Sequence, residues 1–188
     1  RTESIEIPMT PRLAKEAARW KQSVKPPFVQ TPESGQRSVW DFPRPPAVER
    51  VLDRVTIEFG GQTVVSTDRC LRVCETASPP TYYVPRADIA VDVLTPGQGL
   101  SMCEWKGRAR YFDLVVDGRR SEQAAWDYPS VSAEYAVLAD HVAFYASRVD
   151  RCTVAGEVVR PQAGHFYAGW ITSDLAGPFK GDPGTQGW

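Results

Sequence analysis

The stretch VTIEFGGQTVVST, residues 55–67, decides the fold class of this chain. Val55, Ile57 and Phe59 alternate with polar residues, which is the period-two pattern of a strand with one buried face. Two glycines, Gly60-Gly61, separate this run from a second strand-like run. Paired glycines between two such runs are typical of a tight hairpin turn. The stretch therefore predicts an antiparallel β-hairpin.

Similar runs recur along the chain and are separated by turn residues. Most of the 16 prolines and 14 glycines fall between these runs, and neither a βαβ alternation nor a glycine-rich phosphate loop interrupts them. We therefore predict a mostly-β fold of compact antiparallel sheets, which argues against a Rossmann or P-loop enzyme. The further predicted strands are residues 70–76, 81–84, 100–105, 110–116, 141–145 and 152–159, the last folded about Ala155-Gly156.

The first part of the chain has a different character. We predict that residues 1–37 form a proline-rich, extended arm with one short helix, and that residues 38–188 form a single β-rich domain. Thr10 is a suitable N-cap and Pro11 suits the first helical position. We expect the apolar face of this helix to dock on the main body, and that face consists of Leu13, Ala17, Trp20 and Val24.

Composition excludes several classes of partner. The net charge of -1 balances 22 basic against 23 acidic residues, and the basic residues are dispersed, so we expect no nucleic-acid partner. Every apolar run is far shorter than the ~20 residues of a membrane helix. No apolar signal-peptide core follows Arg1, so we expect a protein of the cytoplasm.

The cysteines predict neither disulfides nor a metal site. They form no CxxC pair, and only His141 and His165 are available to complete a zinc site. We therefore expect no bound metal, and the sequence names no cofactor. Free, buried thiols are the expected state of Cys70, Cys74, Cys103 and Cys152.

Four separated motifs carry a resemblance to a known family. They are TYYVP (81–85), CEWKGRARYF (103–112), AAWDYP (124–129) and GWITSDLAGPFKG (169–181). In this order they resemble the domain-of-unknown-function family numbered 427, over residues 38–188. The resemblance implies antiparallel sheets similar to the β-tent arrangement. The family also carries a nucleotidyltransferase-like label, but nucleotidyl transfer needs carboxylates that hold magnesium, and this chain has no Asp-x-Asp.

The CEWKG motif supplies the candidate catalytic residues. Strand alternation would place Glu104 and Lys106 on one face, with Cys103 and Trp105 on the other. Such a Glu/Lys pair is either an acid–base couple or clamp for a polar ligand, or a surface ion pair beside a turn at Gly107. Cys103 would serve as a nucleophile if one of the two histidines lay beside it, and otherwise it packs in the core.

Aromatic residues and the closing segment supply the candidate ligand-binding residues. The aromatic set would line a pocket for a planar or cationic ligand, or would simply form the core. Thr172 and Lys180 lie among glycines, in a segment that suits anion binding or merely wraps the sheet. The aromatic candidates are Tyr82, Tyr83, Trp105, Trp126, Tyr167 and Trp170.

These observations favour a small-molecule-binding domain. Its pocket would be built from the YY-x-P, CEWKG and GW-x-T segments, with Glu104 and Lys106 as polar anchors and Trp105 or Trp170 as a wall. An enzyme on the same pocket is the alternative, either nucleotidyltransferase-like or with Glu104 as general acid or base. A third hypothesis is a structural module whose N-terminal arm engages a partner.

Overall fold

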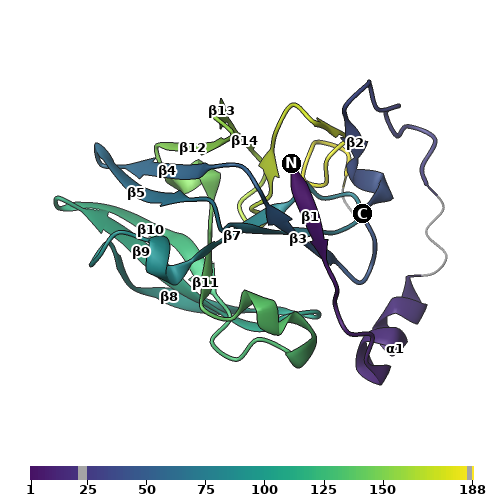
Figure 1. Ribbon diagram of the computed structural model, residues 1–188, viewed down its shortest axis with the longest axis horizontal. Helices are drawn as coiled ribbons and strands as arrows, with labels where there is room; N and C mark the ends of the chain where they lie inside the picture. The colour runs from purple at the N-terminus through teal and green to yellow at the C-terminus, as the bar shows by residue number, and fades with distance from the viewer. Residues whose placement is uncertain (21–24, 186–187) are drawn as a thin grey trace.

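The computed structural model describes residues 1–20, 25–185 and 188, and its largest element is an eight-stranded sheet (Figure 1). All neighbouring strands in this sheet are antiparallel. The mostly-β, antiparallel fold with a short N-terminal helix is thus confirmed. In spatial order the strands are β1 (Thr2–Ile5), β3 (Ala47–Val51), β6 (Leu71–Cys74), β7 (Thr81–Pro85), β11 (His141–Phe144), β10 (Arg119–Asp127), β9 (Gly107–Val116) and β8 (Leu94–Cys103).

A second, four-stranded sheet packs against one face of the first, as Figure 1 shows at the upper left. Its central hairpin is the one predicted from the sequence. Gly60 and Gly61 both have positive φ, at 60° and 78°, as the favoured two-residue hairpin turn requires. The strands of this sheet, in spatial order, are β13 (Glu157–Val158), β12 (Arg151–Val154), β4 (Val55–Phe59) and β5 (Gln62–Thr67).

Strand β7, in the interior of the large sheet, sends neighbouring side chains to opposite faces. Tyr82 belongs to the apolar core between the two sheets, which also contains Ile57 and Phe59. Tyr83 belongs to a separate core on the other face, together with Trp105 and Trp126. The large sheet is therefore covered on both faces, and each face has its own aromatic residues.

The N-terminal segment is tied to the body by a strand as well as by a helix. Strand β1 extends the edge of the large sheet by pairing with β3, and the sequence analysis did not predict either strand. Helix α1 (Pro11–Arg19) begins after the predicted N-cap Thr10, whose hydroxyl accepts from Leu13 N. Leu13 is only 1% exposed, so the helix docks on the body through this residue, whereas Ala17 is half-buried and Trp20, predicted on the same face, is 37% exposed. Val24, predicted on the same face, lies outside the described residues.

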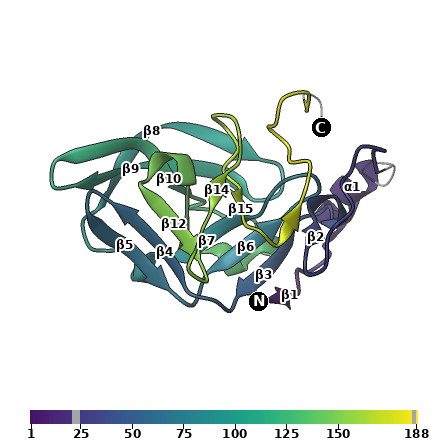
Figure 2. The ribbon, with the colours of Figure 1, turned by 90° about the horizontal axis from the view of Figure 1, so that it is seen from above.

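The closing segment returns to the start of the main body. Strand β16 (Leu175–Ala176) pairs in parallel with β2 (Arg37–Ser38), and Figure 2 shows these two strands side by side. Strands β14 (Arg160–Pro161) and β15 (Trp170–Ile171) form a further antiparallel pair. Short 3-10 helices are η1 (Val39–Asp41), η2 (Arg86–Asp88), η3 (Ala133–Leu138) and η4 (Ala146–Arg148).

The cysteine side chains are free thiols, and three of the four are buried. Cys70, Cys74 and Cys152 are free and buried, as predicted, and burial raises the pKa of each thiol. Cys103 is free and only partly buried. In the part of the chain that the structure describes, no helix is long and apolar enough to cross a membrane.

A bidentate ion pair holds helix α1 to the body. Arg12 donates from Nε and Nη2 to the two carboxylate oxygens of Glu134, at 3.0 and 2.9 Å, and the Thr10 hydroxyl donates to the same carboxylate. Hydrogen bonds from Arg12 and Thr10 outweigh burial and lower the pKa of Glu134 from its usual value to about 2. The ionised carboxylate is therefore the form that the fold stabilises.

We expect Glu134→Gln to lower the free energy of unfolding by about 2 kcal/mol near pH 7, because it removes a charge-assisted, buried hydrogen-bond acceptor. A group with a lowered pKa stabilises the fold above its ordinary pKa, and this stability is lost as pH falls towards the folded value. Urea denaturation should therefore show the difference between wild type and variant shrinking between about pH 4.5 and about pH 2.

Glu16→Gln on helix α1 is the matched control. Glu16 pairs with Arg19 on the surface, at 2.8 Å, so its loss should change stability by less than about 1 kcal/mol. Equal effects of the two substitutions would contradict the assigned role of Glu134.

Candidate functional site

The CEWKG motif forms a turn and not a continuous strand. Strand β8 ends at Cys103, β9 begins at Gly107, and these two residues face each other in the hairpin. Gly107 has φ 105°, which a side chain would disfavour. The three intervening residues do not alternate between faces: Glu104 is exposed, whereas Trp105 and Lys106 are 2% and 6% exposed. The prediction that Glu104 and Lys106 share one face is therefore wrong.

The carbonyl groups of this turn are held by two distant segments. Arg12 donates to Glu104 O and to Trp105 O, both at 3.1 Å. Ser132 donates from Oγ to Trp105 O at 2.7 Å and from its backbone N–H to Lys106 O at 3.0 Å. The same arginine that anchors helix α1 thus positions the turn. Sequence reasoning missed it, because a contact to a backbone carbonyl leaves no pattern in the sequence.

A cavity of about 370 Å³ lies beside this turn, on the Tyr83 face of the large sheet. We call it the aromatic cavity. It brings together most of the predicted site residues, namely Tyr83, Cys103, Glu104, Trp105, Lys106, Trp126, Tyr167 and Lys180. Sequence reasoning missed a second group of its lining residues, which are Glu75, Tyr111, Tyr128, Tyr145 and Phe166.

Lys106 is the central charged group of the aromatic cavity. Its ammonium lies 5.5 Å from the centroid of the Tyr128 ring, and it forms no ion pair with the carboxylates that the structure describes. Burial acts to lower the pKa of Lys106, but interactions with Tyr128, Cys103 and Glu75, including a hydrogen bond to the Cys103 side chain, outweigh it and raise the pKa above its usual value. A buried cation without a directly paired carboxylate therefore faces the cavity.

The nearby carboxylate of Glu75 is already bound. It accepts a hydrogen bond from the Trp105 indole N–H at 3.2 Å and another from Arg44 Nε, also at 3.2 Å. Glu75 is thus hydrogen bonded to Trp105 and Arg44, and its negative charge also contributes to the raised pKa of Lys106.

The walls of the aromatic cavity are neutral rings with polar edges. The rings of Trp126 and Tyr145 lie 4.8 Å apart, centroid to centroid. Burial raises the pKa of Tyr83 and Tyr128, so both phenols keep their protons at neutral pH. The Tyr145 hydroxyl donates to Phe166 O at 2.9 Å. Flat apolar faces and neutral hydroxyls therefore surround the ammonium.

Two predicted aromatic residues lie elsewhere. Tyr82 and Trp170 stack on the opposite face of the sheet, with centroids 4.7 Å apart and ring planes 14° apart. The Trp170 indole N–H donates to Phe144 O at 3.0 Å, and the residue is 0% exposed. Trp170 thus packs in the core and does not contribute to the aromatic cavity.

The two predicted binding residues of the closing segment, Thr172 and Lys180, lie at different sites. Thr172 lies on the Tyr82 face, where its hydroxyl donates to Asp174, and Ser173 donates to Glu157 from both N–H and hydroxyl. An anion at these hydroxyls would be repelled by the carboxylates of Asp174 and Glu157. Lys180, in contrast, reaches the aromatic cavity, with its ammonium 4.9 Å from the centroid of the Tyr167 ring.

Neither histidine lies at Cys103 in the aromatic cavity. His141 is hydrogen bonded through Nδ1 to Ala139 O at 2.8 Å, and neither His141 nor His165 belongs to the cavity lining. The Cys103–His couple considered from the sequence is therefore not formed. Among the described residues, no group of three or more His, Cys, Asp or Glu side chains is arranged to hold a metal ion.

The fold and the cavity together define an antiparallel β protein with a cation-bearing aromatic cavity. Residues 47–155 match a family described as a domain of unknown function (DUF427, short name NTP_transf_9). The chain belongs to this family, as its motifs indicated, and the matched range contains the TYYVP, CEWKGRARYF and AAWDYP motifs but not the closing motif. No curated protein matches the chain.

We expect Trp170→Ala to lower the free energy of unfolding by about 3–5 kcal/mol, because it leaves a cavity in the core and an unpaired carbonyl at Phe144. Chemical denaturation followed by circular dichroism would measure this loss. Trp20→Ala is the matched control, since Trp20 is 37% exposed at the end of α1, and its effect should stay below about 1 kcal/mol. A small effect of Trp170→Ala would contradict its assignment to the core.

Proposed function

We propose that this protein binds a small molecule in the aromatic cavity, and that the ligand is planar and negatively charged. The observation that carries the proposal is the ammonium of Lys106, which is buried, charged and in no ion pair with a described carboxylate. A buried cation is costly unless it is paired with an opposite charge. An anionic group of a ligand would supply that charge.

The shape and chemistry of the walls support the planar part of the ligand. Trp126, Tyr83 and Tyr128 offer ring faces, and the volume of about 370 Å³ lies in the range of small-molecule sites. Aromatic rings stack on one another in offset or edge-to-face arrangements, which favours a flat ligand. Lys180 is a second cation within reach. Glu104, exposed at the rim, is available to a polar group that projects towards solvent.

Calorimetric titration with benzoate and related aromatic carboxylates tests the proposal. We expect saturable binding that weakens at least tenfold in Lys106→Met, because a charge-assisted hydrogen bond contributes about 1.5–3 kcal/mol. Benzamide, which has the same shape without the charge, should bind the wild type no better than it binds the variant.

Lys15→Met on the exposed face of α1 is the control for the removal of one positive charge. It should leave the affinity for aromatic carboxylates within about twofold of wild type, since a distant surface charge is screened by solvent and salt. Equal binding of benzoate to wild type and Lys106→Met would overturn the proposal, provided that both proteins are folded by circular dichroism.

An enzyme that uses the same cavity is the second candidate. Cys103 precedes the turn, Lys106 is its last residue, and both line the cavity. A thiol beside an amine is a pair that covalent catalysis can use. Magnesium-dependent nucleotide binding that is lost in Glu104→Gln would favour the nucleotidyltransferase-like alternative. Metal-independent binding that is lost only in Lys106→Met would favour the binding protein.

A further inference from the structure

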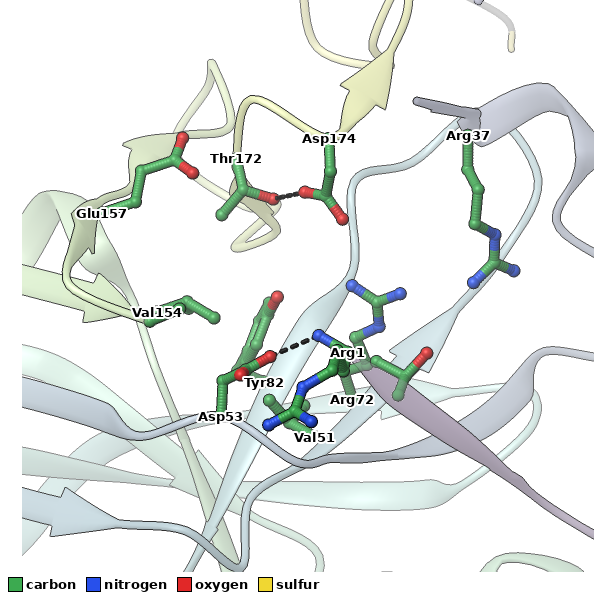
Figure 3. Close-up of a pocket in the computed structure, with 12 residues that line it drawn as sticks. Arg1, Arg37, Val51, Asp53, Arg72, Tyr82, Val154, Glu157, Thr172 and Asp174 are labelled. Carbon is green, nitrogen blue, oxygen red and sulfur yellow. Dashed lines mark hydrogen bonds and ion pairs between the residues drawn. The ribbon is translucent and has the colours of Figure 1, made fainter. Parts of the chain in front are cut away.

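A second cavity, of about 260 Å³, lies on the Tyr82 side of the large sheet (Figure 3). Its floor contains Tyr82 and Arg72, which are 2% and 4% exposed. Its opposite wall carries Thr172, Asp174 and Glu157, from the closing segment and the β12–β13 hairpin. The proposed function does not involve any of these residues, and we call this the two-charge cavity.

The floor of the two-charge cavity presents a guanidinium and a phenol side by side. Arg72 donates from Nε to Glu49 at 2.8 Å, and its guanidinium is also hydrogen bonded to the Tyr82 hydroxyl. The Tyr82 hydroxyl is aimed into the cavity in Figure 3. The two groups thus lie together where both can face a bound carboxylate.

The charge at the floor is positive. Arg37 and Arg72 each donate to Glu49, at 2.8 Å. Burial acts to raise the pKa of Glu49, but the two arginines outweigh it and hold this pKa below its usual value. One carboxylate therefore shares two guanidinium groups, and one positive charge remains uncompensated by these three groups.

The opposite wall is negative. Asp174 accepts from the Thr172 hydroxyl, and Glu157 accepts from Ser173 N at 2.6 Å, but no described cation forms an ion pair with either carboxylate. A simple anion bound to Arg72 would meet this negative wall, and a simple cation would meet the arginines. A ligand that carries both charges matches both walls.

We propose that the two-charge cavity binds a small zwitterion of the free amino acid class. Its carboxylate is held by Arg72 and the Tyr82 hydroxyl, and its ammonium is held by Asp174 and Glu157. The planar guanidinium suits a carboxylate because its parallel N–H donors match the two carboxylate oxygens. The site is independent of the aromatic cavity, since Tyr82 and Tyr83 direct the two sites to opposite faces of one strand.

Calorimetric titration with each of the common free amino acids tests this proposal. We expect saturable binding of at least one of them. The acid that lacks its amino group and the amine that lacks its carboxylate should each bind at least tenfold more weakly, because each loses one of the two walls. Equal affinity for the acid alone would overturn the zwitterion assignment, and failure of every amino acid to bind would overturn the site.

Two conservative substitutions test whether the amino acid binds in the two-charge cavity. Tyr82→Phe keeps the ring stacked on Trp170 and removes only the hydroxyl, and Asp174→Asn keeps the shape of an exposed side chain and removes its charge. Each should weaken amino acid binding about tenfold or more. Tyr135→Phe is the matched control, because Tyr135 donates to Pro46 O and lines neither cavity.

Lys106→Met distinguishes amino acid binding in the two-charge cavity from benzoate binding in the aromatic cavity. It should weaken benzoate binding at least tenfold and leave amino acid binding unchanged, whereas Tyr82→Phe should weaken amino acid binding about tenfold or more and leave benzoate binding unchanged. Loss of amino acid binding in Lys106→Met, with Tyr82→Phe unaffected, would place the amino acid in the aromatic cavity and overturn the proposal for the two-charge cavity.

Discussion

The alternation of Tyr82 and Tyr83 along strand β7 is the constraint on which the rest of the structure depends. Because successive strand residues point to opposite faces, two adjacent tyrosines serve two different environments. Tyr82 stacks on Trp170 under the four-stranded sheet, whereas Tyr83 joins Trp126 beside the aromatic cavity. Slippage of β7 by one residue would exchange these environments, so the register with β6 and β11 maintains both sites.

The family motifs perform different physical tasks in this fold. TYYVP supplies one tyrosine to each face, and CEWKG supplies a hairpin turn whose carbonyl groups are held by Arg12 and Ser132. The glycine of GW-x-T is required by close packing: a Cβ at Gly169 would lie 2.4 Å from Pro79 O. A motif that is recognised as one unit in sequence therefore contains both packing residues and cavity residues.

Most of the β architecture was predictable from local patterns, but the polar strands were not. The hairpin of β4 and β5 has both alternation and paired glycines, so its sequence signal is unambiguous. Strand β1, with the sequence TESI, has little apolar alternation and depends on pairing with β3. Strand β10 begins with the polar pair Arg119-Arg120, which does not indicate a strand, although the strand ends with buried residues such as Trp126. These two strands are stabilised by pairing with neighbouring strands, because their own sequences have little strand propensity or apolar alternation.

The sequence by itself determined the fold class, the hairpin, the N-cap of the helix and the membership of the family, because these depend on periodicity, turn chemistry and short motifs. The tertiary structure alone decided which motif residues meet. It separated Trp170 from Trp126, exposed Glu104 and buried Lys106, and it brought Arg12 to the CEWKG turn from 93 residues away in the chain. The physical reason is that strand alternation assigns a residue to a face only within one strand. Which faces then come together, and where a turn interrupts the alternation, depends on pairing and packing between distant segments.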